Sequence, residues 1–250
     1  MRKNVKLAYL VCLHVILGIL LIKSNLGQQL LPEGALNFSQ RELTDHYHRM
    51  LRFHKRMDGN ILDGSAIFIG DSLTQGLNVS SIAMPAVNYG IGGDTTFGVL
   101  QRLTNYQSLS KASVIIVTIG INDFNLRSNT EMLENYKQIF QRLPANVPVI
   151  INALLPVNEN GHHWLKGFNH RIIALNMQLQ ALTSHYNNFV FLNISSHLVD
   201  PSGHLKPEFH SGDGLHLNSK ANAVWIHLLR EKIIQVKNMK ASIKNESQVQ

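Results

Sequence analysis

Short, almost entirely apolar runs alternate along the chain with longer segments whose apolar residues recur every three or four positions. A short apolar run without alternation is typical of a strand covered on both faces of a parallel sheet. We therefore predict strands over residues 66–69, 87–89, 112–119, 147–154 and 189–192. Because these runs alternate with helical segments, the pattern predicts βαβ units that build one parallel sheet.

Four longer segments have the apolar spacing of amphipathic helices. The capping-box sequences Ser39–Glu42 and Ser128–Glu131 predict the starts of the first two. The third covers residues 168–182, and the last runs from about residue 218 to residue 237. Beyond it, residues 238–250 are polar and predict a frayed tail.

The first residues differ from the rest of the chain. Arg2, Lys3 and Lys6 precede an almost wholly apolar run over residues 7–22, which predicts an export signal. The run is slightly short for a membrane span of about 20 residues, which favours a cleaved signal peptide. Lys23 and the lack of a clean cleavage site keep an uncleaved anchor open. Under either interpretation the protein is exported (periplasmic, secreted or lumenal), and an anchor would attach it to a membrane through residues 7–22.

These patterns divide the chain into four parts. Residues 1–27 are a signal peptide or signal anchor, and residues 28–62 are a lead-in with one helix. Residues 63–237 contain all five predicted strands and form the main domain, and residues 238–250 are the polar tail.

Charge and cysteine content exclude several classes of function. Of the net charge of +7, residues 1–32 contribute four basic and no acidic side chains. The rest shows no basic stripe with interleaved aromatic residues, so we expect no nucleic-acid binding. The only cysteine, Cys12, lies in the apolar run. The remaining chain therefore has no disulfide, no cysteine-based zinc site and no cysteine nucleophile.

Three predicted strands are followed by residues that a buried core would not favour. Ser72 follows the first strand, Gly93 the second and Asn122 the third. The carboxyl ends of parallel strands meet at one edge of the sheet, where ligands usually bind. Ser72 suits either a helix N-cap or a nucleophile. The backbone N–H groups of Ser72 and Gly93 and the amide of Asn122 are suitable donors for an oxyanion.

The loop before the last helix adds a carboxylate and an imidazole, Asp213 and His216. Their spacing of three lets the carboxylate accept a hydrogen bond from the ring and select its tautomer. His216 would then take the Ser72 proton as general base and return it to the leaving group. This combination predicts a Ser-His-Asp triad.

Four blocks in this order resemble those of the GDSL-type SGNH hydrolases, over about residues 60–235. The matching stretches are Gly70-Asp71-Ser72-Leu73, Asn88–Thr95, Gly120–Asp123 and Asp213–His216. The resemblance implies an α/β fold, a flavodoxin-like three-layer α/β/α sandwich with a five-stranded parallel sheet. It also implies nucleophile Ser72, base His216, orienting Asp213, oxyanion donors Ser72, Gly93 and Asn122, and no metal or other cofactor.

We therefore predict a serine esterase that hydrolyses a small acyl or acetyl ester of a lipid or carbohydrate through an acyl-Ser72 intermediate. The stretch Gly90–Thr96 is also similar to the platelet-activating factor acetylhydrolases, which implies a short acyl group. Two alternatives stay open, an acyltransferase that uses the same triad and a binding module without turnover. The sequence does not predict the oligomeric state.

The loop after the fourth predicted strand contains candidates for the substrate pocket, namely Asn158, His162, His163 and Trp164. Trp164 would equally suit an anchor for the following helix. A zinc hydrolase is disfavoured, because the pairs His162-His163 and His204…His210 have no carboxylate at useful spacing.

Overall fold

The computed structural model describes residues 42–246, with side chains up to residue 238. The chain divides into two compact units, residues 1–44 and residues 45–250, and the second contains the sheet. The predicted signal segment over residues 1–27 lies outside the described residues. Among residues 42–246, no helix is both long and apolar enough to cross a lipid bilayer.

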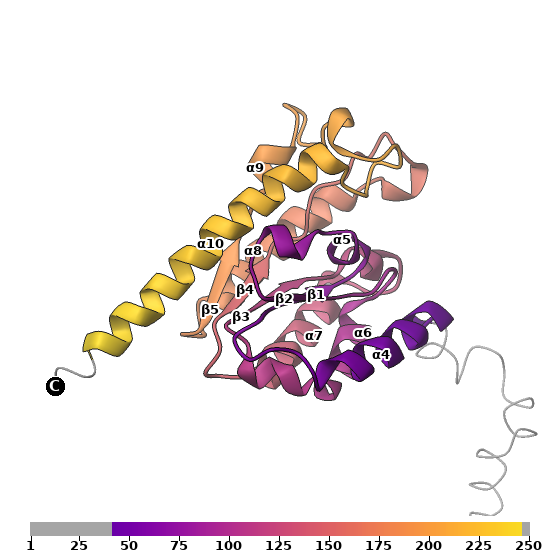
Figure 1. Ribbon diagram of the computed structural model, residues 1–250. Helices are drawn as coiled ribbons and strands as arrows, with labels where there is room; N and C mark the ends of the chain where they lie inside the picture. The colour runs from indigo at the N-terminus through magenta and orange to yellow at the C-terminus, as the bar shows by residue number, and fades with distance from the viewer. Residues whose placement is uncertain (1–41, 247–250) are drawn as a thin grey trace, which may run out of the picture. The chain divides into compact units, whose positions relative to one another are not determined.

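Five parallel strands form one sheet in the spatial order β2-β1-β3-β4-β5 (Figure 1). The strands are β1 (Ala66–Gly70), β2 (Ala86–Gly90), β3 (Val114–Thr118), β4 (Val149–Asn152) and β5 (Phe189–Leu192). The chain passes from β1 to β2 and then returns to the other side of β1 to form β3. The winding therefore changes direction between β1 and β3, and open α/β sheets bind ligands beyond the carboxyl ends of strands at such a point.

Helices and short 3₁₀ turns connect the strands. The helices are α4 (Asp45–Asp58), α5 (Ser72–Gln75), α6 (Thr96–Arg102), α7 (Asn129–Arg142), α8 (Phe168–Thr183), α9 (Ser195–Leu198) and α10 (Ser219–Glu246). The 3₁₀ turns are η1 (Val79–Ser81), η2 (Leu103–Asn105), η3 (Gln107–Lys111), η4 (Ile121–Asn125), η5 (His163–Leu165) and η6 (Pro207–Phe209).

Alternate residues of each strand point to opposite faces of the sheet, and the apolar side chains on both faces are covered by helices. Ile67 and Ile115 belong to a core that includes residues of α6, α7 and α8. Phe68 and Ile116 belong to a second core, with residues of α5 and α10. The fold is the three-layer α/β/α sandwich with a five-stranded parallel sheet that the sequence predicts.

Helix α10 is held against the sheet by a buried tryptophan. Trp225 is completely buried, and its ring N–H donates to Asn152 Oδ1 at the end of β4, at 3.1 Å. This contact places the start of α10, and so positions the loop that carries Asp213 and His216.

Most predicted elements are confirmed, and the differences lie at their ends. β5 has the predicted bounds, and the capping box of Ser128 and Glu131 opens α7. β3 and β4 are shorter than predicted, because the apolar residues that flank them are buried outside the hydrogen-bonded ladder. α4 begins at Asp45 rather than at the predicted capping box, whose Ser39 lies outside the described residues. α10 continues to Glu246, so the predicted frayed tail after Lys237 is wrong for residues 238–246.

Candidate active site

The turn after β1 presents Ser72 at the first position of α5. The N-cap is Asp71, whose carboxylate accepts a hydrogen bond from the Leu73 backbone N–H at 3.0 Å. A side chain at Gly70 would overlap Thr74 Oγ1 and the Thr118 carbonyl oxygen, so this close approach requires glycine. Because Asp71 caps the helix, the Ser72 hydroxyl is available for another contact.

That contact is with the imidazole of His216. Ser72 Oγ lies 3.0 Å from His216 Nε2, although the two residues are 144 positions apart. On the other side of the ring, His216 Nδ1 lies 2.5 Å from Asp213 Oδ2. All three side chains are partly exposed. The structure thus brings together the three residues of the predicted triad with the connectivity that proton transfer needs.

The carboxylate of Asp213 is held in its charged form. Partial burial opposes ionisation, but hydrogen bonds from the His216 ring and from the backbone N–H groups of Leu215 and His216 outweigh it. Together they lower the pKa of Asp213 to about 2. A carboxylate next to Nδ1 requires the proton on that nitrogen, which leaves Nε2 as the acceptor for the Ser72 hydroxyl.

A second histidine shapes the loop that carries Asp213 and His216. The backbone N–H groups of Gly212 and Gly214 both donate to His210 Nδ1, at 3.1 Å each. Gly214 has a φ of +77°, and a side chain there would collide with the Asn158 carbonyl oxygen. Sequence reasoning treated His210 only as an unsuitable zinc ligand. The sequence contains no local signal for this role, because the ring acts on backbone groups.

The predicted oxyanion donors lie at the same edge of the sheet. Gly70 at the end of β1 pairs with Gly90 at the end of β2 and with Thr118 at the end of β3. The loops that follow these three strands therefore begin side by side. Gly93 is exposed and has a φ of +76°. Asn122 Nδ2 donates one hydrogen to the Asp94 carbonyl oxygen at 2.9 Å, and an amide has a second N–H for a ligand.

If Asn122 is an oxyanion donor, replacing it with alanine should lower kcat for p-nitrophenyl acetate by about 10²- to 10³-fold. The effect should fall on kcat rather than KM, because the donor acts on charge that develops in the transition state. Asn129→Ala is a matched control, since the Asn129 amide also donates to a carbonyl oxygen, that of Arg171. Equal kcat values for the two variants would refute the role of Asn122.

A completely buried arginine, Arg102, connects the end of β1 to the loop that follows β2. Arg102 Nε donates to Asp94 Oδ2 at 2.8 Å, and Nη2 donates to the carbonyl oxygen of Gly70 at 3.0 Å. Nη1 donates to the Tyr106 hydroxyl at 2.9 Å. The sequence predicts that Asp94 and Thr95 cap the helix that follows them. Thr95 is the N-cap of α6, whereas the Asp94 carboxylate accepts the hydrogen bond from Arg102. The role of Arg102 went unpredicted, because the Gly70 carbonyl oxygen that it reaches lies 32 positions earlier in the chain.

Buried carboxyl groups flank Ser72, Gly93 and Asn122 in the sequence. Burial, together with the negative charges of Asp94 and Asp123, raises the pKa of Asp71 to about 7, although the hydrogen bond from the Leu73 backbone N–H opposes the shift. Burial likewise raises the pKa of Asp94 to about 6, against the opposing effect of Arg102. Asp123 accepts hydrogen bonds from the Thr96 hydroxyl and backbone N–H, which ties its loop to α6.

The raised pKa of Asp71 predicts a stability that depends on pH. The folded chain holds this proton up to about pH 7, whereas the unfolded chain loses it near 3.8, so the free energy of unfolding falls as the pH rises between these values. Asp71→Asn keeps the capping oxygen and removes this dependence. We compare the free energy of unfolding of the variant with that of wild type at each pH, measured in urea. We expect the difference to be about 2 kcal/mol more in favour of the variant at pH 8 than at pH 5. A difference that does not change with pH would contradict this assignment.

One of the four predicted pocket residues, Asn158, is bonded to the loop that carries Asp213 and His216. The Asn158 backbone N–H donates to the Gly214 carbonyl oxygen at 2.7 Å, and the Asn158 side chain is buried. His162 and His163 are exposed. Trp164 is 39% exposed and makes an edge-to-face contact with Phe168 at the start of α8, which fits the alternative role as a helix anchor.

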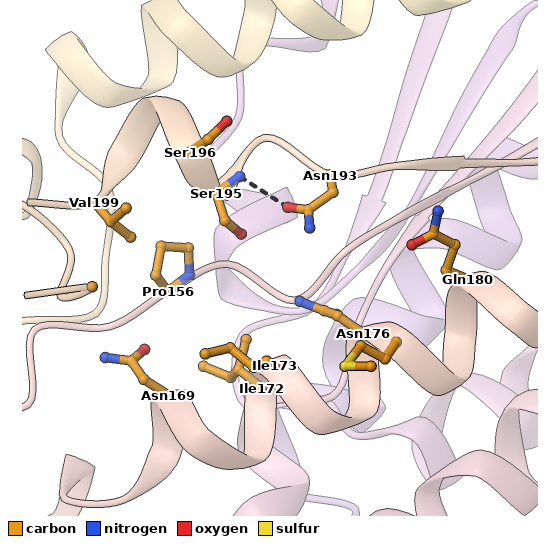
Figure 2. Close-up of a pocket in the computed structure, with 12 residues that line it drawn as sticks. Pro156, Asn169, Ile172, Ile173, Asn176, Gln180, Asn193, Ser195, Ser196 and Val199 are labelled. Atoms are coloured by element: carbon orange, nitrogen blue, oxygen red, sulfur yellow. Dashed lines mark hydrogen bonds between the residues drawn. The ribbon is translucent and has the colours of Figure 1, made fainter. Parts of the chain in front are cut away.

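A cavity of about 240 Å³ lies elsewhere, between α8 and the segments that follow β4 and β5 (Figure 2). Its lining includes no residue of the predicted triad and none of the four predicted pocket residues. The amides of Asn169 and Asn176 in its wall bond the backbones of Val157 and Leu154. These polar groups therefore hold the segment after β4 in place. Within residues 42–246, no cluster of three His, Cys, Asp or Glu side chains is arranged to hold a metal ion.

Comparison with known proteins agrees with this geometry. Residues 68–224 match the model of the GDSL-like lipase/acylhydrolase family. Platelet-activating factor acetylhydrolase IB subunit alpha2 of Gallus gallus is 29% identical over 201 residues, which cover 75% of this chain and 85% of that protein.

Solved structures show the same fold. A GDSL-like lipase from Bacteroides thetaiotaomicron superposes with a TM-score of 0.66 at 18% identity, over 74% of this chain and 97% of that one. The structure of a carbohydrate esterase family 3 protein from Talaromyces cellulolyticus superposes with a TM-score of 0.55 at 16% identity. The match covers 70% of this chain and 98% of that one. The family match spans more than half of the chain, which therefore belongs to the GDSL-like lipase/acylhydrolase family of ester-bond hydrolases.

Proposed function

We propose that the protein is a serine esterase that cleaves a small acyl or acetyl ester of a lipid or carbohydrate. The observation that carries the proposal is the continuous chain of contacts from Ser72 Oγ to His216 and on to Asp213. A serine hydroxyl is activated as a nucleophile when it is hydrogen-bonded to an imidazole ring whose other nitrogen bonds an ionised carboxylate.

The reaction has two halves. In the first, Ser72 Oγ attacks the ester carbonyl while His216 Nε2 takes the hydroxyl proton, and the tetrahedral oxyanion accepts hydrogen bonds from Ser72, Gly93 and Asn122. Collapse of the intermediate expels the alcohol, which receives the proton from His216. In the second half, His216 deprotonates a water that attacks acyl-Ser72. Collapse of this second intermediate releases the carboxylic acid, and His216 returns the proton to Ser72 Oγ. Asp213 stabilises the imidazolium in both halves without itself taking the proton.

A short acyl group is supported by the relative in Gallus gallus, whose name specifies an acetylhydrolase. The carbohydrate esterase among the structural neighbours supports a sugar ester as an alternative source of the same acyl group. We propose that Asn158, His162, His163 and Trp164 line the acyl or leaving-group pocket, because their loop is bonded to the loop that carries Asp213 and His216.

A panel of p-nitrophenyl esters from acetyl to palmitoyl tests the acyl preference. We expect kcat/KM to be highest for acetyl and to fall with chain length. A preference for palmitoyl would refute the small-acyl proposal while leaving the esterase assignment intact. Product analysis with added sugar acceptors separates hydrolysis from transfer, since a transferase would release acyl-sugar instead of free acid.

We also propose that the protein is exported, on the basis of the basic and apolar pattern of residues 1–27. N-terminal sequencing of the protein from the medium or from membranes distinguishes a cleaved signal peptide from an anchor. Recovery of the intact chain only from the cytoplasm would refute export.

A further inference from the structure

Helix α4 carries a concentrated basic face that plays no part in the proposed reaction. Arg49, Arg52, Lys55 and Arg56 lie within eight residues, are all exposed, and border an open depression of about 520 Å³. We call these four residues the basic face. In the part of the chain that the structure describes, no carboxylate forms an ion pair with any of them. Sequence reasoning found no basic stripe and missed this surface.

The spacing of the arginines places them in one row. Arg49, Arg52 and Arg56 are three and four residues apart, so they share one side of the helix over a length of about 10 Å. Like charges at these spacings repel one another and destabilise a helix. The packing of α4 does not need these charges, because its contacts with the body come from residues such as Tyr47, Leu51 and Met57.

We propose that the basic face binds a linear sulfated polysaccharide. Guanidinium groups bind oxyanions such as sulfate through paired hydrogen bonds, and a row of them matches a row of sulfates along a polymer. Phe53 lies beside the row, is 45% exposed, and has the Arg56 guanidinium 6.0 Å from its ring centre. An exposed ring next to cations provides an apolar surface for the C–H face of a sugar.

Two other polyanions fit less well. A helix that binds a membrane surface inserts its apolar side between the lipids, but the apolar side of α4 is packed against the body of the protein. A nucleic acid would meet the charge requirement, and the choice of polysaccharide over nucleic acid rests on the proposed export. The inference is otherwise independent of the proposed esterase activity.

Heparin affinity chromatography and calorimetry with the full-length protein test the proposal. The triple variant Arg49→Gln/Arg52→Gln/Arg56→Gln should elute at lower salt than wild type and lose at least about tenfold in heparin affinity at physiological ionic strength. The charge-matched variant Lys220→Gln/Lys232→Gln/Lys237→Gln on α10 should behave as wild type. Both should keep wild-type hydrolysis of p-nitrophenyl acetate, which also reports correct folding. If the triple arginine variant does not fold, Arg52→Gln alone removes the central charge of the row.

Three outcomes would overturn the proposal. Equal losses in the arginine and lysine variants would show that only net charge matters. Binding of phosphatidylglycerol vesicles as tight as that of heparin would assign the face to membranes instead. Equally tight binding of a DNA duplex would assign it to nucleic acid. Because none of these outcomes depends on ester hydrolysis, failure here is distinguishable from failure of the esterase assignment.

Discussion

Replacing Ser72 with alanine is expected to lower kcat/KM for p-nitrophenyl acetate by at least about 10³-fold. The variant lacks the oxygen that forms the acyl-enzyme, so the two-step route through acyl-Ser72 is lost. Ser72 is the first residue of α5 and Asp71 provides the cap, so the melting temperature should change little. Initial rates with the acetyl ester and thermal unfolding measure the two effects separately.

Two further measurements make this prediction decisive. Wild type should be labelled by an organophosphonate at Ser72, and Ser72→Ala should not. Ser72→Ala/His216→Ala should be no slower than Ser72→Ala alone, because the members of a triad act as one unit. Wild-type activity in a correctly folded Ser72→Ala would exclude the acyl-Ser72 mechanism. A binding module without turnover would show neither labelling nor a difference between the proteins.

The second large effect is expected on stability. Arg102→Met should lower the free energy of unfolding by about 3–5 kcal/mol, because it leaves the buried carboxylate of Asp94 without its charged partner. The carbonyl oxygen of Gly70 and the hydroxyl of Tyr106 also lose a donor. Urea unfolding at pH 8, where Asp94 is ionised, measures the loss.

A matched control separates this effect from the loss of any surface charge. Lys137 forms an exposed ion pair with Glu134, and Lys137→Met should change the free energy of unfolding by less than about 0.5 kcal/mol. Arg102→Lys should remain strongly destabilised, because one ammonium cannot reach the three acceptors that a guanidinium spans. A loss below about 1 kcal/mol in Arg102→Met would mean that the pair is not a major support of the fold.

Arg102→Met should also alter catalysis in the molecules that remain folded. Arg102 supports the Asp94 side chain, and the Asp94 carbonyl oxygen accepts the hydrogen bond that orients Asn122. We therefore expect kcat to fall while KM stays close to the wild-type value, since the oxyanion donors act mainly in the transition state. A parallel change in both constants would indicate a general loss of structure.

Local sequence patterns were sufficient for the strands, most helices and the order of the candidate site residues. An uninterrupted apolar run such as residues 114–117 has few stable environments other than the middle of a parallel sheet. The capping box at Ser128 works within one helical turn, so neighbouring residues alone determine it. By contrast, α4 begins later than predicted and α10 ends later, since helix ends depend on weak local preferences.

The sequence by itself determined the alternation of strands and helices and the residue types that suit ester hydrolysis, because both depend on nearest neighbours along the chain. Only the tertiary structure decided that Ser72 Oγ and His216 Nε2 lie 3.0 Å apart. It alone revealed that Arg102 connects the end of β1 to the loop after β2. It also revealed that His210 holds the loop that carries Asp213 and His216. It also decided which side of α4 packs against the body and which leaves its arginines in solvent. The contacts of Ser72 with His216 and of Arg102 with Gly70 join residues far apart in the chain, and no local pattern encodes which distant groups the fold will bring together.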